Sequence, residues 1–197
     1  MKVGKKMNFV EPIKDRAQLD AMKIILRATP EYGARDEAIF VTGINTALRV
    51  SDILLLTVGD VCDNKGGFQD SITLKEKKTG KNKTFPLNES IKQALKAYFD
   101  SRKEMVPEAP LFTNKSGKSL SRVRVWQILN AAAKKIGLKH IGTHTLRKTF
   151  GYYTFKKSNG NIALVQKLLN HKSSADTLRY IGIEQEQLNA AYLNLNL

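Results

Sequence analysis

Residues 144–180 read HTLRKTFGYYTFKKSNGNIALVQKLLNHKSSADTLRY. They overlap a longer segment, residues 109–175, that contains no Asp or Glu but thirteen Lys and Arg. A surface without carboxylates attracts polyanions. The same part of the chain supplies four side chains of the types that bind and attack a phosphodiester: His144, Arg147, His171 and Tyr180. This stretch therefore indicates a domain whose substrate is a nucleic-acid backbone.

The composition of the whole chain agrees with a nucleic-acid partner. With 197 residues, 42% of them hydrophobic, the chain can form one sizeable domain or two small ones around a hydrophobic core. Its formal net charge is +15 and its pI is about 9.9. Because much of this charge lies in one segment, it is typical of a protein that binds an extended polyanion. A basic membrane-binding surface is the alternative, but every apolar helix face that we find is needed for the core.

Several other classes of protein are excluded by the residues that the chain lacks. Its single cysteine, Cys62, cannot form an intramolecular disulfide or a Cys-rich zinc site, and it fits a reducing compartment. There is no run of 18 apolar residues and no secretory signal, so we expect no membrane span and a cytoplasmic location. Three histidines without paired acids make a poor metal site, and no GxxxxGK[ST] motif is present. We therefore expect neither a metal nor another cofactor.

The spacing of apolar residues predicts an α+β fold, mainly α-helical, with a small three-stranded antiparallel sheet. The expected helices run from Pro12 to just before Pro30, then over 33–47, 50–56 (capped by Ser51), a stretch beginning at the cap Asn88, 119–136, 144–157, 161–169, 174–181 and 184–193. The expected strands are 58–62, 71–74 and 83–87, which are separated by turn sequences. Residues 1–12 are expected to be an N-terminal extension, and residues 13–197 a single domain.

Two groups of residues could carry chemistry, and each also has an ordinary structural explanation. His144 and Arg147 are three residues apart at a helix start, where they share a face with free N–H groups and could hold a phosphate. An ordinary histidine near a helix cap with a surface arginine fits equally well. Arg49 lies between two apolar runs, where an unpaired guanidinium is rare. Asp52 could brace it in a purely structural ion pair, or Arg49 could serve a site.

Three further residues indicate a catalytic function only when they are considered together. Lys78 lies in the lysine-rich turn 75–83, which is either a solvated loop or a hairpin whose lysine reaches DNA and acts as a general acid. His171 follows an apolar helix, whose C-terminal end favours an imidazolium, although such a histidine alone is usually a surface residue. Tyr180 alone would be a core residue, but it follows His171 by nine residues on a short helix beside the acid-free segment.

Together these residues resemble the tyrosine recombinase, or phage integrase, family. The resemblance covers about residues 15–185 and rests on six positions in the family's order. Its motifs are Thr42-Gly43-Ile44 through Ala47-Leu48-Arg49-Val50-Ser51-Asp52, Lys77-Lys78-Thr79-Gly80-Lys81, Pro110-Leu111-Phe112, His144-Thr145-Leu146-Arg147, Leu168-Leu169-Asn170-His171 and Tyr180.

The resemblance implies a role for each of the six positions. Tyr180 would attack the scissile phosphate and form a 3′-phosphotyrosine, without a metal or ATP. Arg49 and Arg147 would bind the non-bridging oxygens. Lys78 would protonate the leaving 5′ oxygen, His144 would help to remove the tyrosine proton, and His171 would donate to a phosphate oxygen. The predicted catalytic set is therefore Arg49, Lys78, His144, Arg147, His171 and Tyr180.

The chain also departs from the family pattern. Asn170 stands where the family usually has Gly, and Lys77 could compete with Lys78. Family members usually carry a separate core-binding domain before the catalytic domain, whereas here the catalytic domain begins almost at once. The chain is therefore either a fragment or a naturally short recombinase, and we expect no separate core-binding domain within it.

The expected partner is double-stranded DNA, bound by a homo-tetramer that could be a monomer in solution. The family's synapse suggests that residues 184–197 pass to a neighbouring copy, with a docking face of Leu188, Ala191, Tyr192 and Leu195. Residues expected to contact DNA are Lys77, Lys81, Arg122, Arg124, Lys148 and Lys172. Three alternatives remain: a type IB topoisomerase-like enzyme that acts without synapsis, a recombinase remnant that only binds DNA, and a generic basic nucleic-acid binder.

Overall fold

The computed structural model describes residues 10–63, 67–77, 80, 82–102, 106–183, 189, 190 and 192–195. In chain order its elements are α1 (Arg16–Arg27), α2 (Gly33–Asn45), α3 (Val50–Ile53), α4 (Val58–Val61), β1 (Ser71–Lys75), β2 (Asn82–Pro86), α5 (Glu89–Phe99), α6 (Arg122–Lys135), α7 (Thr143–Lys157), α8 (Ile162–Leu169) and α9 (Ser174–Ile181). The fold is mainly helical with a small antiparallel sheet, as predicted. Among these residues, no helix has both the length and the apolar character needed to cross a membrane.

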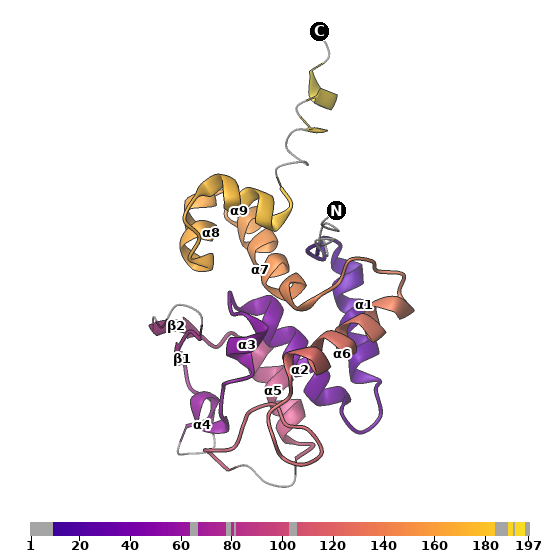
Figure 1. Ribbon diagram of the computed structural model, residues 1–197, viewed down its shortest axis with the longest axis vertical. Coiled ribbons are helices and arrows are strands. Elements are labelled where there is room, and N and C mark those ends of the chain that lie inside the picture. The colour runs from indigo at the N-terminus through magenta and orange to yellow at the C-terminus, as the bar shows by residue number, and fades with distance from the viewer. Residues whose placement is uncertain are drawn as a thin grey trace, which may run out of the picture.

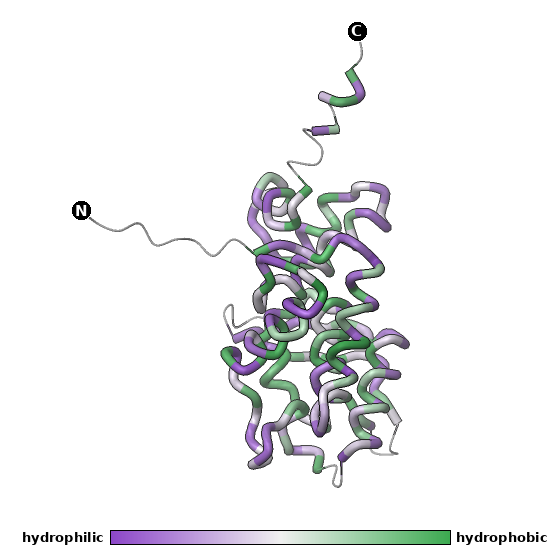
Figure 2. The backbone as a smooth tube through the Cα atoms, turned by 90° about the vertical axis from the view of Figure 1, so that its right-hand side faces the viewer, coloured by the Kyte–Doolittle hydropathy of each residue, from purple (hydrophilic) through white to green (hydrophobic). Residues whose placement is uncertain are grey.

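Helix α2 lies at the centre of the fold, where it packs against α1, α5 and α7 (Figure 1). It is buried along most of its length because apolar residues occur all round it rather than on one stripe. Figure 2 shows hydrophobic segments gathered in the interior of the body. A second, smaller cluster of buried side chains joins α7, α8 and α9 to Ala47. This second cluster positions α9, which carries Tyr180.

The sheet has two strands among the described residues, so the prediction of three strands is wrong. Strands β1 and β2 pair antiparallel, with Leu74 opposite Lys83. The predicted strand 58–62 is instead helix α4, followed by a single bridge between Cys62 and Phe68.

A capping box explains why this segment is helical. The hydroxyl of Thr57 accepts a hydrogen bond from the Asp60 N–H, and the Asp60 carboxylate accepts one from the Thr57 N–H at 2.7 Å. These reciprocal bonds satisfy two backbone donors that a first helical turn would otherwise leave unpaired. They outweigh the β preference of Val58 and Val61, which is weak and depends on context.

Other element ends also differ from the predictions. Helix α1 begins at Arg16, after Asp15 accepts from the Ala17 N–H, rather than at Pro12. Helix α3 follows Arg49, so Ser51 is not its N-cap. The cap at Asn88 is confirmed, since its side chain accepts from the Ile91 N–H. The predicted helix 184–193 lies largely outside the described residues.

The close approach of α7 to α9 requires a glycine. A Cβ added at Gly151 would lie 2.7 Å from Cγ2 of Ile181 and 3.1 Å from Cδ1 of Leu169. We expect Gly151→Ala to lower the free energy of unfolding by about 1–3 kcal/mol through overpacking, of which better helix propensity offsets at most about 1 kcal/mol. Urea titration measures the change. Adding Ile181→Leu, which removes the Cγ2 methyl, should recover part of the loss. Wild-type stability for the single variant would show that the contact relaxes without cost.

Candidate active site

Tyr180 lies among basic side chains that come from separate parts of the chain. Nδ1 of His144, in the first turn of α7, is 3.3 Å from the Tyr180 hydroxyl. The His171 ring meets the Tyr180 ring edge-on, with 4.8 Å between centroids. The ammonium of Lys148 is 5.0 Å from the centroid of the same ring. The structure therefore brings together three of the predicted catalytic residues.

Arg147 belongs to the same cluster but lies in the protein interior. Its side chain is almost completely buried, and its guanidinium donates hydrogen bonds to the carbonyl oxygens of Ala47 and Leu169. Burial lowers the pKa of Arg147, and the neighbouring Tyr180 opposes that effect. Since guanidinium remains charged in proteins, Arg147 places a fixed positive charge beside the phenol.

Arg49 is held by two buried carboxylates. Its Nη1 is 3.3 Å from Oε1 of Glu76 and 3.8 Å from Oδ2 of Asp52. The bracing by Asp52 was predicted, whereas Glu76 was missed. Asp52 also accepts a hydrogen bond from the Lys77 backbone N–H at 3.0 Å, which joins the start of the hairpin turn to α3. About a fifth of the Arg49 side chain stays exposed, so it can still reach a ligand.

The hairpin brings a lysine to this site that the sequence did not reveal. Lys78 and Lys81, both predicted to act here, lie outside the described residues. Lys83, on β2, donates to the carbonyl oxygen of Leu168 at 2.9 Å and to that of Ala47 at 3.5 Å. Burial first, and then repulsion by Arg147, lowers the pKa of Lys83 to about 8.

Burial also sets the protonation of the central groups. It raises the pKa of the Tyr180 phenol, although Arg147 and Arg49 oppose the shift. It lowers the pKa of His144 and of His171, and Arg147 lowers both further. At neutral pH the site therefore holds a protonated tyrosine beside two neutral imidazoles.

These histidine shifts predict how stability depends on pH. Both folded-state pKa values lie below the ordinary 6.5, so just below that pH the unfolded chain binds more protons than the folded one. We therefore expect the free energy of unfolding to fall as the pH drops from about 7.5 to about 5.5. Urea titration at both pH values should show a smaller fall in a variant carrying both His144→Asn and His171→Asn. His140→Asn, on the loop before α7, is the control; an equal fall in all three proteins would contradict the expectation.

The turn between α8 and α9 fixes His171. Asn170 ends α8 in the left-handed conformation, with φ of 50°. Asn tolerates this conformation better than most residues other than Gly, so its replacement of the family's Gly is structurally mild. Nδ1 of His171 is 3.2 Å from the hydroxyl oxygen of Thr177, and that hydroxyl donates to the Ser173 carbonyl. The hydroxyl must therefore accept from His171, which assigns the Nδ1–H tautomer to the neutral imidazole.

Several residues predicted to contact DNA lie on the surface around this cluster. Arg122 and Arg124 are exposed in the first turn of α6, and Arg122 contributes to lowering the pKa of His144. Lys77 and Lys172 are also exposed, and Lys148 is partly buried beside Tyr180. Positive charge therefore extends from the cluster onto α6, the hairpin and the α8–α9 turn.

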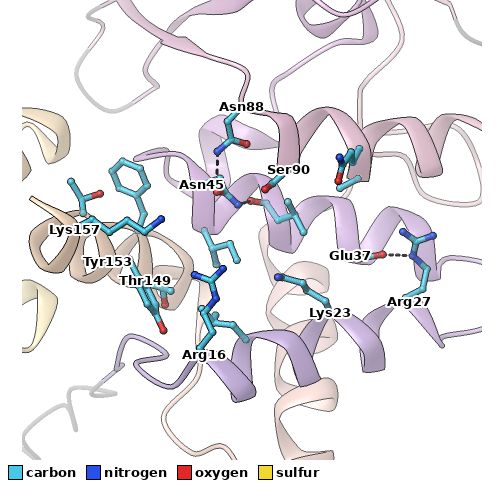
Figure 3. Close-up of a pocket in the computed structure, with 17 residues that line it drawn as sticks. Arg16, Lys23, Arg27, Glu37, Asn45, Asn88, Ser90, Thr149, Tyr153 and Lys157 are labelled. Carbon is cyan, nitrogen blue, oxygen red and sulfur yellow. Dashed lines mark hydrogen bonds and ion pairs between the residues drawn. The ribbon is translucent and has the colours of Figure 1, made fainter.

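A cavity of about 550 Å³ lies between α1, α2, α5 and α7, apart from the tyrosine cluster (Figure 3). Its wall includes Arg16, Lys23 and Lys157, together with an ion pair between Arg27 and Glu37. None of the six predicted catalytic residues lines it. Within the part of the chain that the structure describes, no group of three or more His, Cys, Asp or Glu side chains could hold a metal ion.

Comparison with known proteins identifies the family of this chain. The model of the phage integrase family matches residues 16–187. The chain is 41% identical over 187 residues to the probable integrase/recombinase YoeC of Bacillus subtilis (strain 168), a match that covers 94% of this chain and 97% of YoeC. It is 33% identical over 162 residues to tyrosine recombinase XerC of Pelobacter propionicus (strain DSM 2379 / NBRC 103807 / OttBd1), covering 82% of this chain and 52% of XerC.

A solved structure has the same fold. The XerH site-specific recombinase, crystallised with a palindromic difH substrate in a post-cleavage complex, superposes with a TM-score of 0.72 at 22% identity, covering 94% of this chain and 53% of that one. The chain thus spans nearly all of YoeC but about half of XerC and XerH. By its sequence matches, the chain belongs to the phage integrase family and is a site-specific recombinase of the tyrosine type, an enzyme of DNA strand breakage and rejoining.

Proposed function

We propose that this recombinase cleaves double-stranded DNA with Tyr180 and holds the cut end as a 3′-phosphotyrosine. The Tyr180 oxygen attacks the phosphorus, a new O–P bond forms, and the bond to the 5′ oxygen breaks. A 5′-hydroxyl later reverses these steps, and since the covalent link retains the phosphodiester, rejoining needs no ATP. The observation that carries the proposal is the placement of the Tyr180 phenol against His144 and beside Arg147. None of these steps requires a metal or another cofactor.

Two proton transfers accompany the bond changes. His144 accepts the phenol proton, a role that its distance of 3.3 Å and its lowered pKa support, because only a neutral imidazole can act as a base. Lys78 gives its proton to the 5′ oxygen as that bond breaks. For Lys78 the support is its place in the family motif, since it lies outside the described residues.

The remaining catalytic residues bind the phosphate. Arg49 and Arg147 donate to the non-bridging oxygens and stabilise the charge that grows in the transition state. His171 donates from Nε2, and because its Nδ1–H is used by Thr177, it must first take up a second proton. A bound phosphate favours this uptake, since a nearby negative charge raises the pKa of an imidazole.

The surrounding cations hold the duplex. Lys77, Lys148 and Lys172 contact the phosphodiester backbone, together with Lys81 from outside the described residues. Arg122 and Arg124 lie where they could reach base edges, because an arginine fork matches the major-groove edge of guanine. Removal of a backbone contact would weaken binding to all DNA sequences equally, whereas removal of a base contact would change the sequence preference.

The protein acts in the cytoplasm as a homo-tetramer on DNA, and residues 13–197 form its catalytic domain. Tyr192 and Leu195, predicted to face a neighbouring copy, are strongly exposed, which supports a docking role for the C-terminal segment. Leu188 and Ala191, predicted for the same face, lie outside the described residues.

The test is covalent capture on DNA. Supercoiled plasmid and nicked suicide duplexes are incubated with the protein in the presence of EDTA. The reactions are stopped with SDS, and the products are analysed for protein joined to a 3′ end. The proposal predicts an adduct on the suicide duplex and exchange of strands between two duplexes that share a site. Relaxation without exchange would favour a type IB topoisomerase-like activity. DNA binding with no adduct on either substrate would favour a non-catalytic remnant.

A further inference from the structure

One ammonium group connects three parts of the active site. Lys83, on β2, donates to the carbonyl oxygen of Leu168 and to that of Ala47. Ala47 lies two residues before Arg49, and Leu168 lies three residues before His171. The hairpin, the segment of Arg49 and the end of α8 are therefore joined at Nζ of Lys83.

The register of the hairpin directs Lys83 inward. Side chains alternate between the two faces of a strand, so Ile72, Leu74 and Glu76 share one face of β1 and its continuation. Ile72 and Glu76 are buried, and Lys83 pairs with Leu74. Lys83 therefore lies on the buried face of the hairpin, whereas Lys75 is exposed on the opposite face.

Like Lys83, Arg147 links the segment of Arg49 to the end of α8. Its guanidinium donates to the carbonyl oxygen of Ala47, which Lys83 also uses, and to that of Leu169, next to Leu168. A phosphate that binds Arg147 competes with those carbonyls for its N–H groups. Lys83, as a second cation between the Arg49 segment and the end of α8, would keep these two segments in place while Arg147 binds the phosphate.

We propose that Lys83 is a positioning residue for DNA cleavage: its charged ammonium sets the spacing between the segments that carry Arg49 and His171. The inference rests on the proposed cleavage chemistry. Charge matters because hydrogen bonds from an ionised donor are about twice as strong as those between neutral groups. Lys83 does not itself donate a proton to the leaving oxygen.

The charged groups around Lys83 make this clamp dependent on pH. Burial, Arg147 and Arg49 disfavour its charge, whereas Glu76 and Asp52 favour it. With a pKa of about 8, the free protein loses the ammonium in mildly alkaline solution. A DNA phosphate adds negative charge to the site, so bound DNA shifts this loss to higher pH.

The first experiment compares single-turnover cleavage of a suicide duplex by wild type and Lys83→Met across about pH 6.5 to 9.5. The Met variant keeps an unbranched side chain up to the ε position but removes the ammonium and its charge. Near neutral pH we expect cleavage to fall by about 10²-fold with nearly unchanged DNA affinity. The ratio of the two rates should then shrink as the pH rises, because wild type loses the same charge, while titrations shared by both proteins cancel. A ratio independent of pH would overturn the proposal.

Two variants and a modified substrate separate positioning from other roles. Lys83→Arg should retain part of the activity, and Lys75→Met, on the exposed face, should behave as wild type. A duplex with sulfur in place of the 5′ bridging oxygen needs no general acid, since a thiol has a pKa of about 8.5. Restoration of Lys83→Met to the wild-type rate on this duplex would make Lys83 the proton donor and refute the positioning role.

Hydrogen exchange tests the clamp without cleavage. Lys83→Met should speed amide exchange in residues 46–49 and 169–171, and Lys75→Met should leave it unchanged. Failure of wild type to form any adduct would count against the proposed function, whereas unchanged exchange in Lys83→Met would count against the clamp itself.

Discussion

Replacing Tyr180 with phenylalanine is expected to abolish covalent capture of DNA while leaving the protein folded. The change removes a single oxygen, which lies 3.3 Å from Nδ1 of His144. The ring keeps its edge contact with His171 and its place in the second hydrophobic cluster. Without the oxygen there is no nucleophile, so the rate of adduct formation should fall by at least about 10⁴-fold.

A suicide duplex at saturating protein measures this loss directly. Tyr153→Phe is the matched control, because it also removes one phenol oxygen from the same part of the fold, where Tyr153 donates to the Lys14 carbonyl. That control should form the adduct at the wild-type rate, and both variants should bind DNA as wild type does. An adduct that persists in Tyr180→Phe would place the nucleophile elsewhere.

The groups around Tyr180 control the protonation of its phenol. Burial raises the pKa of the phenol, so the free hydroxyl is protonated in neutral solution. Arg147 and Arg49 favour the phenolate, and Nδ1 of His144 lies within reach of the proton, so the cations proposed to bind the phosphate would also activate the nucleophile. This coupling explains why a tyrosine with an ordinary pKa of about 10 could work at neutral pH only within such a cluster.

Local signals allowed much of the helical framework to be predicted. Helix α9 spans the residues expected for it, and α7 begins one residue before the expected start. The N-cap at Asn88 was also predicted correctly, because capping depends on residues that are close in sequence. The prediction of a strand over 58–62 was wrong, because two local signals compete there. The capping box of Thr57 and Asp60 favours a helix and outweighs the β preference of the valines.

Contacts between distant residues were the part that the sequence did not reveal. Lys83 is 36 residues from Ala47 and 85 from Leu168, and nothing nearby in the sequence distinguishes it from the other lysines of the turn. Glu76 is 27 residues from Arg49, and only the inward face of the hairpin makes it a partner. The alternation of apolar residues at Ile72 and Leu74 could have indicated Glu76, because it continues onto the buried face at that residue. Lys83 is assigned to that face only by the register of the hairpin. The roles of Lys78 and Lys81 stay predictions.

Arg147→Gln is expected to have the second-largest effect, and it should impair both cleavage and stability. Loss of one preorganised donor to a developing negative charge typically lowers a rate by about 10²–10³-fold. The same change removes the Arg147 donor from the carbonyl of Leu169 and leaves the carbonyl of Ala47 with only its longer bond from Lys83. An unpaired buried polar group costs about 1–3 kcal/mol. A cleavage rate measured alone would therefore confuse the two losses.

A second arginine in the fold allows the two effects to be separated. Arg102 donates to the Leu111 carbonyl and lies over the ring of Tyr98, in a different part of the core. Arg102→Gln should lower the free energy of unfolding but leave single-turnover cleavage unchanged under conditions where both proteins are folded. Arg147→Lys should recover some stability through one carbonyl bond, yet cleavage should stay low because an ammonium cannot contact two phosphate oxygens as a guanidinium fork does. If Arg147→Gln, kept folded and saturated with DNA, cleaved at the rate of Arg102→Gln, Arg147 would be a structural residue and the phosphate would have to be bound by Arg49 and His171.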